Sequence, residues 1–193
     1  FLMPGKLSKQ VAYMEANPDV GVSYTHHYHF WNDTKQYASY DFEVLETYPL
    51  KQFLYGHDNG VSLPVHAALI RRDIWSEGEP PFVEDYPYRY EDWIFWVRVC
   101  LRKVGFHFID ERLVAYRMHG RNFVTDHPTV AFNALQAVMY ISNLLPAEER
   151  KDFAEKKVRF IVDRLYQASA PAEEKQHLMG KVMSKARALL RRM

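Results

Sequence analysis

The stretch Val20–Trp31, VGVSYTHHYHFW, has β-branched and aromatic residues on both of its faces and contains no charged residue and no proline. Such residues favour strands, and their presence on both faces indicates a strand that is buried on both sides. This segment predicts a sheet in the first part of the chain. The residues that follow, 32–46, are polar and begin with a turn at Asn32-Asp33, and their pattern assigns no further element.

A helix is predicted before this strand. Leu7, Val11 and Met14 repeat with helical spacing, and the pattern ends at Asn17-Pro18, because proline disfavours helix in the residue before it. The other expected elements are a short helix over 49–55 that stops at Gly56, a strand over 65–70, irregular chain over 77–88, and two short strands over 106–109 and 113–118 separated by Asp110-Glu111.

A second amphipathic helix is predicted from Glu91 onward and is expected to end at Gly105. Glu91 and Asp92 then occupy its first turn, where the partial positive charge of a helix N-terminus stabilises carboxylates. Acids at this position are common helix-start chemistry, and they are also placed for catalysis because a long irregular segment leads into them. The apolar stripe of this helix consists of Trp93, Trp96, Val97, Cys100 and Leu101.

The character of the chain changes near His127-Pro128. All four tryptophans and most of the other aromatic residues precede this point, where apolar runs are short and interrupted by Pro and Gly. Three long stretches with helical spacing follow it. We therefore expect an α/β fold with a mixed sheet and helices in residues 1–127, and a three-helix bundle in residues 128–193.

Composition excludes several classes of protein. The 193 residues carry a formal net charge of +1, which is too small a field to predict nucleic-acid binding. The single cysteine, Cys100, cannot form an internal disulfide framework and fits a reducing, cytoplasmic compartment. No segment approaches the roughly 18 uncharged apolar residues of a membrane span. Because the chain starts with Phe1 and no leader peptide, we expect it to be a piece of a longer protein.

A second group of polar residues follows the last expected strand. The segment 116–120, YRMHG, places Arg117 and His119 on one strand face, at a strand end of the kind where α/β folds carry functional side chains. A histidine at a strand end can equally be structural. His27 and His29 also share a strand face, but no acid or cysteine follows at a spacing that completes a metal site.

Four segments occur in an order that is typical of one enzyme family: residues 1–22, residues 54–72, Tyr90-Glu91-Asp92-Trp93, and residues 113–119. Together they resemble the second half of a family 2 glycosyltransferase with the GT-A fold, over residues 1–122. The resemblance implies a partial GT-A-like sheet and an inverting enzyme that transfers a sugar from a nucleotide-sugar donor to a glycan or lipid-linked acceptor. The family's nucleotide-binding half and its Asp-x-Asp motif would precede Phe1, so this chain alone is expected to be inactive.

The resemblance also implies roles on the acceptor side. Asp92 is the general base that takes a proton from the acceptor hydroxyl, and Glu91 orients Asp92 or binds acceptor hydroxyls. Trp93 offers an apolar ring to a sugar face. All three residues lie at the start of the helix predicted from Glu91.

On the donor side, the resemblance implies that His119 ligates Mn²⁺ or Mg²⁺ bound to the leaving pyrophosphate. Arg117 adds positive charge there. The loop that contains Gly60 and His66 lies beside the donor sugar, although Val65-His66 is bulkier than the small residues that family members often carry. These assignments place the donor-binding residues in segments that are far apart in the sequence.

The last predicted helix, 175–193, is basic, since its charged residues are all Lys or Arg. Such a helix can contact the inner face of a membrane peripherally, or it can pack on its neighbours and leave its basic face in water. Unpaired strand edges predict self-association into a homo-oligomer. The main alternative function is a non-catalytic module that binds carbohydrate or a protein partner. RNA binding is disfavoured, because no aromatic residue follows Tyr166 to stack on bases.

Overall fold

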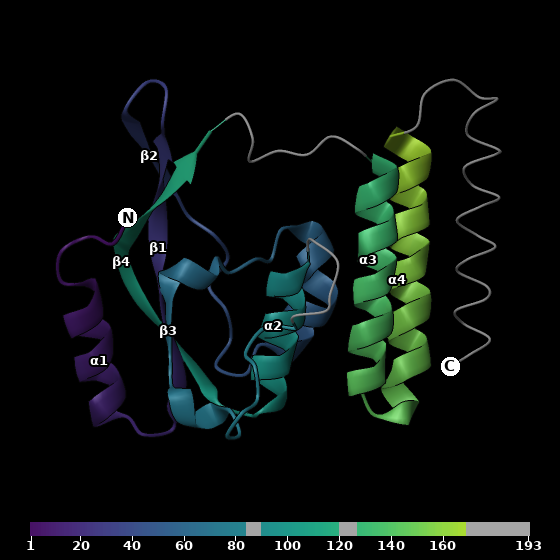
Figure 1. Ribbon diagram of the computed structural model, residues 1–193, viewed down its shortest axis with the longest axis horizontal. Coiled ribbons are helices and arrows are strands. Elements are labelled where there is room, and N and C mark those ends of the chain that lie inside the picture. Colours follow the sequence, from purple (N-terminus) through teal and green to yellow (C-terminus); the bar gives the residue numbers. More distant parts are fainter. Residues whose placement is uncertain (84–89, 120–126, 169–193) are drawn as a thin grey trace. The chain divides into compact units, whose positions relative to one another are not determined.

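The computed structural model describes residues 1–83, 90–119 and 127–168 (Figure 1). The chain forms two compact units. We call Phe1–Phe82 with Phe95–Val124 the sheet unit, and Val83–Ile94 with Thr125–Met193 the helical unit. Within the described residues, no helix has the length and apolar character needed to cross a membrane.

The sheet unit is built around β1 (Val20–Trp31) in a four-stranded mixed sheet. β4 (Gly105–Met118) runs parallel to β1 along its whole length. On the other side of β1, β3 (Ala68–Ile70) pairs antiparallel with its first half and β2 (Gln36–Tyr40) pairs antiparallel with its second half. The predicted strand 20–31 is confirmed, and its first eight residues are buried. An α/β fold with a mixed sheet is therefore present.

β4 is one strand and not the two short strands predicted from sequence. The register of β4 against β1 jumps from Ile109, opposite Thr25, to Arg112, opposite His26. The polar pair Asp110-Glu111 is therefore accommodated as a β-bulge. A bulge inserts extra residues into a strand without ending its pairing. The polar pair therefore interrupts the hydrophobic sequence pattern of β4, but β4 continues as one strand.

β2 is the second strand of a hairpin that the sequence left unassigned. The predicted turn at Asn32-Asp33 is confirmed, and the N–H of Lys35 donates to the Trp31 carbonyl at 2.8 Å. Lys35 has a φ of 58°, in the left-handed region. All five residues of β2 are exposed. Because neither face is buried, β2 lacks the hydrophobic alternation by which strands are recognised in a sequence.

The helix predicted before β1 is confirmed as α1 (Lys6–Ala16), but a different stripe faces the sheet. Its buried residues are Lys6, Gln10 and Met14, whereas Leu7 and Val11 are exposed. Hydrogen bonds explain this orientation. Gln10 Nε2 donates to the Ser23 carbonyl at 2.7 Å, and Lys6 Nζ donates to Gln10 Oε1 at 2.7 Å.

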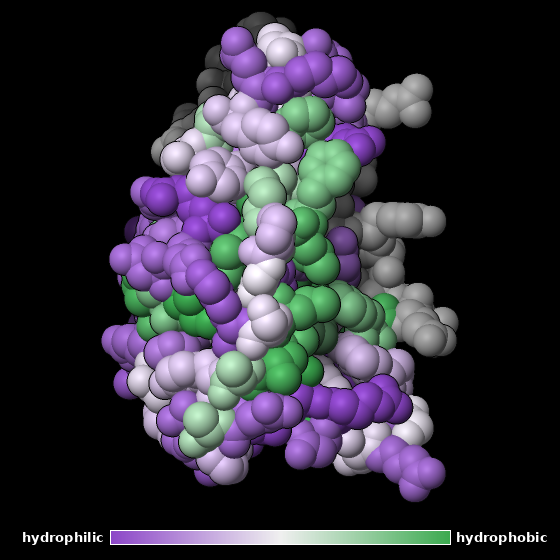
Figure 2. Space-filling model, turned by 90° about the vertical axis from the view of Figure 1, so that its left-hand side faces the viewer, coloured by the Kyte–Doolittle hydropathy of each residue, from purple (hydrophilic) through white to green (hydrophobic). Residues whose placement is uncertain are grey.

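Hydrophobic surface is therefore exposed on the sheet unit. Figure 2 looks onto the side of this unit that carries α1 and shows an apolar area bordered by hydrophilic residues. Exposed apolar side chains of this unit include Phe1, Leu2, Leu7 and Val11. Self-association, which the sequence predicts for this chain, stays a prediction.

The helix with the acid pair is confirmed as α2 (Glu91–Leu101). It ends four residues before the predicted stop at Gly105. Lys103, with a φ of 57°, makes the left-handed turn that usually requires glycine, and its N–H donates to the Cys100 carbonyl at 2.9 Å. Gly105 instead begins β4, where an added Cβ would lie 3.1 Å from the Asp19 carbonyl oxygen. Close approach of the chain just before β1, and not a helix end, favours glycine here.

Short helical turns connect these elements. The helix expected over 49–55 is present as a π-helix (Gln52–Gly56), and a 3₁₀ turn (His57–Asn59) extends it beyond Gly56. The strand expected over 65–70 is shorter: Val65–Ala67 forms a 3₁₀ turn and only β3 continues as strand. A further 3₁₀ turn (Arg72–Ile74) follows β3.

The helical unit contains α3 (His127–Leu144) and α4 (Ala147–Ala168), which lie side by side (Figure 1). Two of the three helices predicted after Pro128 are confirmed, and the third, 175–193, lies outside the described residues. The first turn of α2 belongs to this unit, where the Trp93 ring lies 6.1 Å from the Phe153 ring of α4, whereas the rest of α2 belongs to the sheet unit.

Candidate functional site

The acid pair lies at the beginning of α2, as predicted. The chain enters the helix at Tyr90, whose φ of 66° is in the left-handed region. Its carbonyl accepts the first helical hydrogen bond, from the N–H of Ile94 at 3.0 Å. A non-glycine residue in this conformation costs on the order of 1 kcal/mol, and such strain is concentrated at functional sites. The strained residue directly precedes Glu91 and Asp92.

Asp92 differs from Glu91 in its surroundings. Glu91 is exposed, whereas Asp92 is half-buried. Burial raises the pKa of Asp92 above its usual range, because a low-dielectric environment penalises the carboxylate. Hydrogen bonds from the backbone N–H groups of Trp93, at 2.8 Å, and of Asp92 itself partly oppose this rise. The carboxylate of Asp92 is thus positioned by hydrogen bonds and has an increased proton affinity.

Trp93, the third predicted acceptor-side residue, packs inside the helical unit. Its side chain is only 3% exposed. The ring lies 6.1 Å from the Phe153 ring of α4, and Lys157 Nζ lies 5.2 Å from its centre. A ring with this little exposure offers no free face to a sugar, so the structure gives Trp93 a packing role in place of the predicted stacking role.

Two predicted donor-side residues, His66 and Arg117, line the same pocket of the sheet unit. This pocket has a volume of about 240 Å³ and lies at the edge of β4. His66 comes from the 3₁₀ turn before β3, and the Arg117 guanidinium lies 4.8 Å from the centre of the Phe1 ring. The pocket is lined by Phe1, Leu2, His66, Val114, Ala115, Tyr116 and Arg117.

The imidazole of His66 has unused hydrogen-bonding capacity. Its Nε2 is buried and has no hydrogen-bond partner among the described residues. Burial lowers the pKa of His66 to about 4. His66 is therefore neutral at pH 7, and its ring stacks on that of Tyr116 with 5.1 Å between centroids.

Gly60 and His119 lie outside this lining. Gly60 follows the 3₁₀ turn His57–Asn59 and ends it with a φ of 92°. Its N–H donates to the His57 carbonyl at 3.3 Å. The turn itself therefore requires a glycine. His119 is exposed directly after the end of β4. Across residues 1–83, 90–119 and 127–168, no group of three or more His, Cys, Asp or Glu side chains is placed to hold a metal ion.

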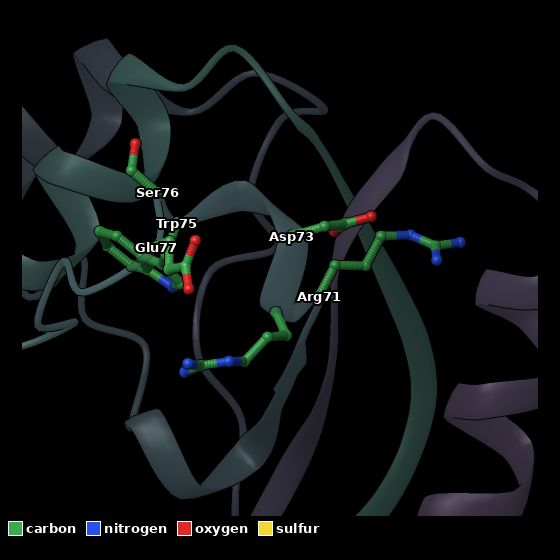
Figure 3. A pocket seen from close by; sticks show the side chains of 6 residues that line it. Arg71, Asp73, Trp75, Ser76 and Glu77 are labelled. Atoms are coloured by element: carbon green, nitrogen blue, oxygen red, sulfur yellow. The ribbon is translucent and has the colours of Figure 1, made fainter.

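A larger pocket, of about 520 Å³, lies where the chain leaves β3 (Figure 3). Figure 3 shows the Arg71 side chain running away from Trp75 and Glu77. Its Nε donates to the Val20 carbonyl at 2.9 Å, and its terminal Nη2 donates to the Met14 carbonyl in the last turn of α1. Arg71 thus joins α1 to the sheet. None of the predicted site residues lines this pocket.

Sequence reasoning missed a cluster of aromatic and imidazole rings around His27 and His29. The ring of Tyr40 lies 4.9 Å from that of His27 and 4.5 Å from that of His29. The alternation of β1 placed the two histidines on one face, but only the hairpin and β4 bring Tyr40 and Tyr116 to them. No periodicity in the sequence signals these partners.

Comparison with known proteins adds no family assignment, since neither a protein-family model nor a curated protein matches the chain.

Proposed function

We propose that this chain is the acceptor-side part of an inverting glycosyltransferase that transfers a sugar from a nucleotide-sugar donor to a glycan or lipid-linked acceptor. The observation that carries the proposal is the environment of Asp92. A half-buried carboxyl group whose pKa is raised accepts a proton more readily than an exposed one. The strained Tyr90 and the backbone N–H of Trp93 hold it in position.

The reaction follows from a base at this position. The Asp92 carboxylate takes the proton of an acceptor hydroxyl, and the hydroxyl oxygen forms a bond to the anomeric carbon of the donor sugar. The bond from that carbon to the diphosphate oxygen breaks, and its electron pair stays on the nucleoside diphosphate. Attack from the side opposite the leaving group inverts the anomeric centre. Glu91, exposed beside Asp92, is the orienting or acceptor-binding carboxylate of the proposal.

The donor side of the proposal uses the end of β4. Arg117 supplies positive charge toward the leaving diphosphate, and Gly60 and His66 belong to the neighbouring loop. The family resemblance assigns His119 to Mn²⁺ or Mg²⁺, which stabilises charge on the leaving group. One imidazole does not make a site for a hard divalent ion, which prefers oxygen ligands, and within the described residues His119 belongs to no group of three or more possible metal ligands. No step above is therefore routed through a metal.

A second candidate function is a non-catalytic carbohydrate-binding module. Exposed aromatic rings on one face of the β1–β2 hairpin, Trp31 and Tyr40, favour it. Such a module needs no proton acceptor, so the two functions differ in their dependence on Asp92.

The deciding experiment compares Asp92→Asn and Glu91→Gln in the parent enzyme that the proposal implies, by release of nucleoside diphosphate in the presence of acceptor. Asp92→Asn keeps the size of the side chain and removes the proton acceptor, so turnover falls by about 10²–10⁴. Glu91→Gln costs less, and donor affinity changes in neither variant. Asp163→Asn, which alters an exposed carboxylate on α4, is the matched control.

The opposite outcome is equally clear. If the acid pair only stabilises the start of α2, each variant loses a charge-dipole interaction of roughly 0.3–1 kcal/mol. The melting temperature then falls slightly and turnover stays near that of the wild type. Normal turnover in Asp92→Asn removes Asp92 as the base.

A further inference from the structure

Five ring side chains make one continuous surface on the sheet unit, which we call the ring track: Trp31, His29, Tyr40, Tyr116 and His66. Alternation along β1 places His27, His29 and Trp31 on one face of the sheet. The strand register places Tyr116 beside His29, and Tyr40 beside His27, on that same face. His66 reaches the face from the turn before β3.

Ring contacts connect the whole track. His29 lies 6.5 Å from Trp31, 4.5 Å from Tyr40 and 6.1 Å from Tyr116, measured between ring centroids. Tyr116 continues the track to His66 at 5.1 Å. The last two residues line the 240 Å³ pocket, so the track leads from the hairpin into that pocket.

The track is accessible and uncharged. Trp31 is 43% exposed, Tyr40 44% and Tyr116 38%. Burial lowers the pKa of His29 and of His66, so both imidazoles are neutral at pH 7. A neutral imidazole offers one N–H donor and one nitrogen acceptor, and a phenol hydroxyl offers both as well. The surface thus combines ring faces with hydrogen-bonding groups and has no formal charge.

A sugar ring has the complementary chemistry, because its C–H face is apolar and its hydroxyl edge both donates and accepts hydrogen bonds. An anionic polymer or an anionic lipid surface is recognised chiefly through Lys and Arg side chains, which the five rings of the track do not include; Arg117 lines only the pocket at its end. Uncharged glycan is therefore the ligand that this surface matches best in both shape and charge.

We propose that the ring track binds an uncharged glycan chain along Trp31, Tyr40 and His29, with its end at the pocket of Tyr116 and His66. This inference rests on the proposed function and narrows its acceptor to a neutral glycan rather than a lipid-linked or acidic one. A chain bound along the track ends at this pocket, where His66, Tyr116 and Arg117 are the polar residues of a largely apolar lining. Acceptor length then controls affinity, because each additional sugar covers a further ring.

The test applies the purified chain to an array of neutral oligosaccharides of increasing length that contain glucose, galactose, mannose or N-acetylglucosamine, and titrates the best binder by calorimetry. Polygalacturonate and vesicles of phosphatidylcholine with phosphatidylglycerol are the competing ligands. We expect binding to a neutral oligosaccharide that strengthens with length. Trp31→Ala and Tyr40→Ala each weaken it about tenfold, in line with the loss of a ring contact.

Tyr37→Ala is the matched control, because Tyr37 is 54% exposed on the same hairpin but pairs with Phe30 and so lies on the opposite face. It retains wild-type affinity. The inference is overturned if no neutral oligosaccharide binds, if only the anionic polymer or the vesicles bind, or if Tyr37→Ala loses as much affinity as Trp31→Ala. If transfer depends on Asp92 but no neutral glycan binds the ring track, the proposed function stands and the ring-track inference fails. If a neutral glycan binds the ring track but transfer does not depend on Asp92, the ring-track inference stands and the proposed function fails.

Discussion

Mild acid is expected to destabilise this protein through His27, which is only 2% exposed between β4 and β2. The pKa of His27 is lowered from 6.5 to about 4, chiefly by burial and also by the neighbouring His29, His66 and His26, while Asp41 opposes this shift. In the unfolded chain the imidazole binds a proton below about pH 6.5, whereas in the folded chain it stays neutral down to about pH 4. The unfolded state thus binds more protons within this window.

The sign and the size of the effect follow from proton linkage. Stability is fully present above the unfolded pKa and is lost as the pH falls from about 6.5 toward 4. With these two pKa values, His27 alone lowers the free energy of unfolding by about 2 kcal/mol between pH 7 and pH 5. The buried His66, with its pKa also lowered to about 4, acts in the same direction.

The assay is urea unfolding followed by tryptophan fluorescence at pH 7 and pH 5, on the wild type and on His27→Phe. Nδ1 of His27 has no hydrogen-bond partner among the described residues, so phenylalanine sacrifices no bond at that atom. The variant should lose about 2 kcal/mol less than the wild type between the two pH values. Any repacking cost is common to both pH values and cancels in this difference.

Tyr28→Phe, on the opposite face of β1, is the control and should keep the wild-type pH dependence. An NMR titration of the His27 ring provides a second measurement on the unaltered chain, and protonation should begin only below about pH 5. Equal acid sensitivity in wild type and His27→Phe, or a His27 titration near pH 6.5, would refute the reasoning.

Three further predictions concern stability and reactivity. Gln10→Ala leaves the Ser23 carbonyl without its 2.7 Å donor and should cost about 1–3 kcal/mol in urea unfolding, whereas a cost below 0.5 kcal/mol would show that water replaces the amide. Gly21→Ala places a Cβ 2.5 Å from Val104 Cβ and should lower the melting temperature. An unchanged melting temperature would contradict the close packing of β1 against Val104, in the loop between α2 and β4. Cys100 is buried, and burial raises the pKa of its thiol, so it should react with a disulfide reagent only after unfolding; rapid labelling of the native chain would contradict this.

Local sequence patterns were sufficient for elements whose pattern agrees with their surroundings. β1 has β-branched and aromatic residues on both faces along its length and is buried on both faces over its first eight residues, and its bounds are those that the sequence predicts. The start of α2 can also be predicted from the sequence, because acids in a first turn and an apolar stripe are local features. The role of Asp92 as a base stays a prediction, and the structure adds that Asp92 is half-buried and that burial raises its pKa.

Tertiary structure decided everything that depends on partners far apart in the chain. Gln10 is buried because its amide reaches β1, and no periodicity in residues 6–16 reveals that contact. Trp93 looks like a binding platform in the sequence and is instead packed against α4. The ring track joins residues from β1, β2, β4 and the turn before β3. The sequence by itself determined which segments are strands and helices, since these follow from neighbouring residues, whereas only packing decided which faces meet, because the energy of a contact depends on both of its partners.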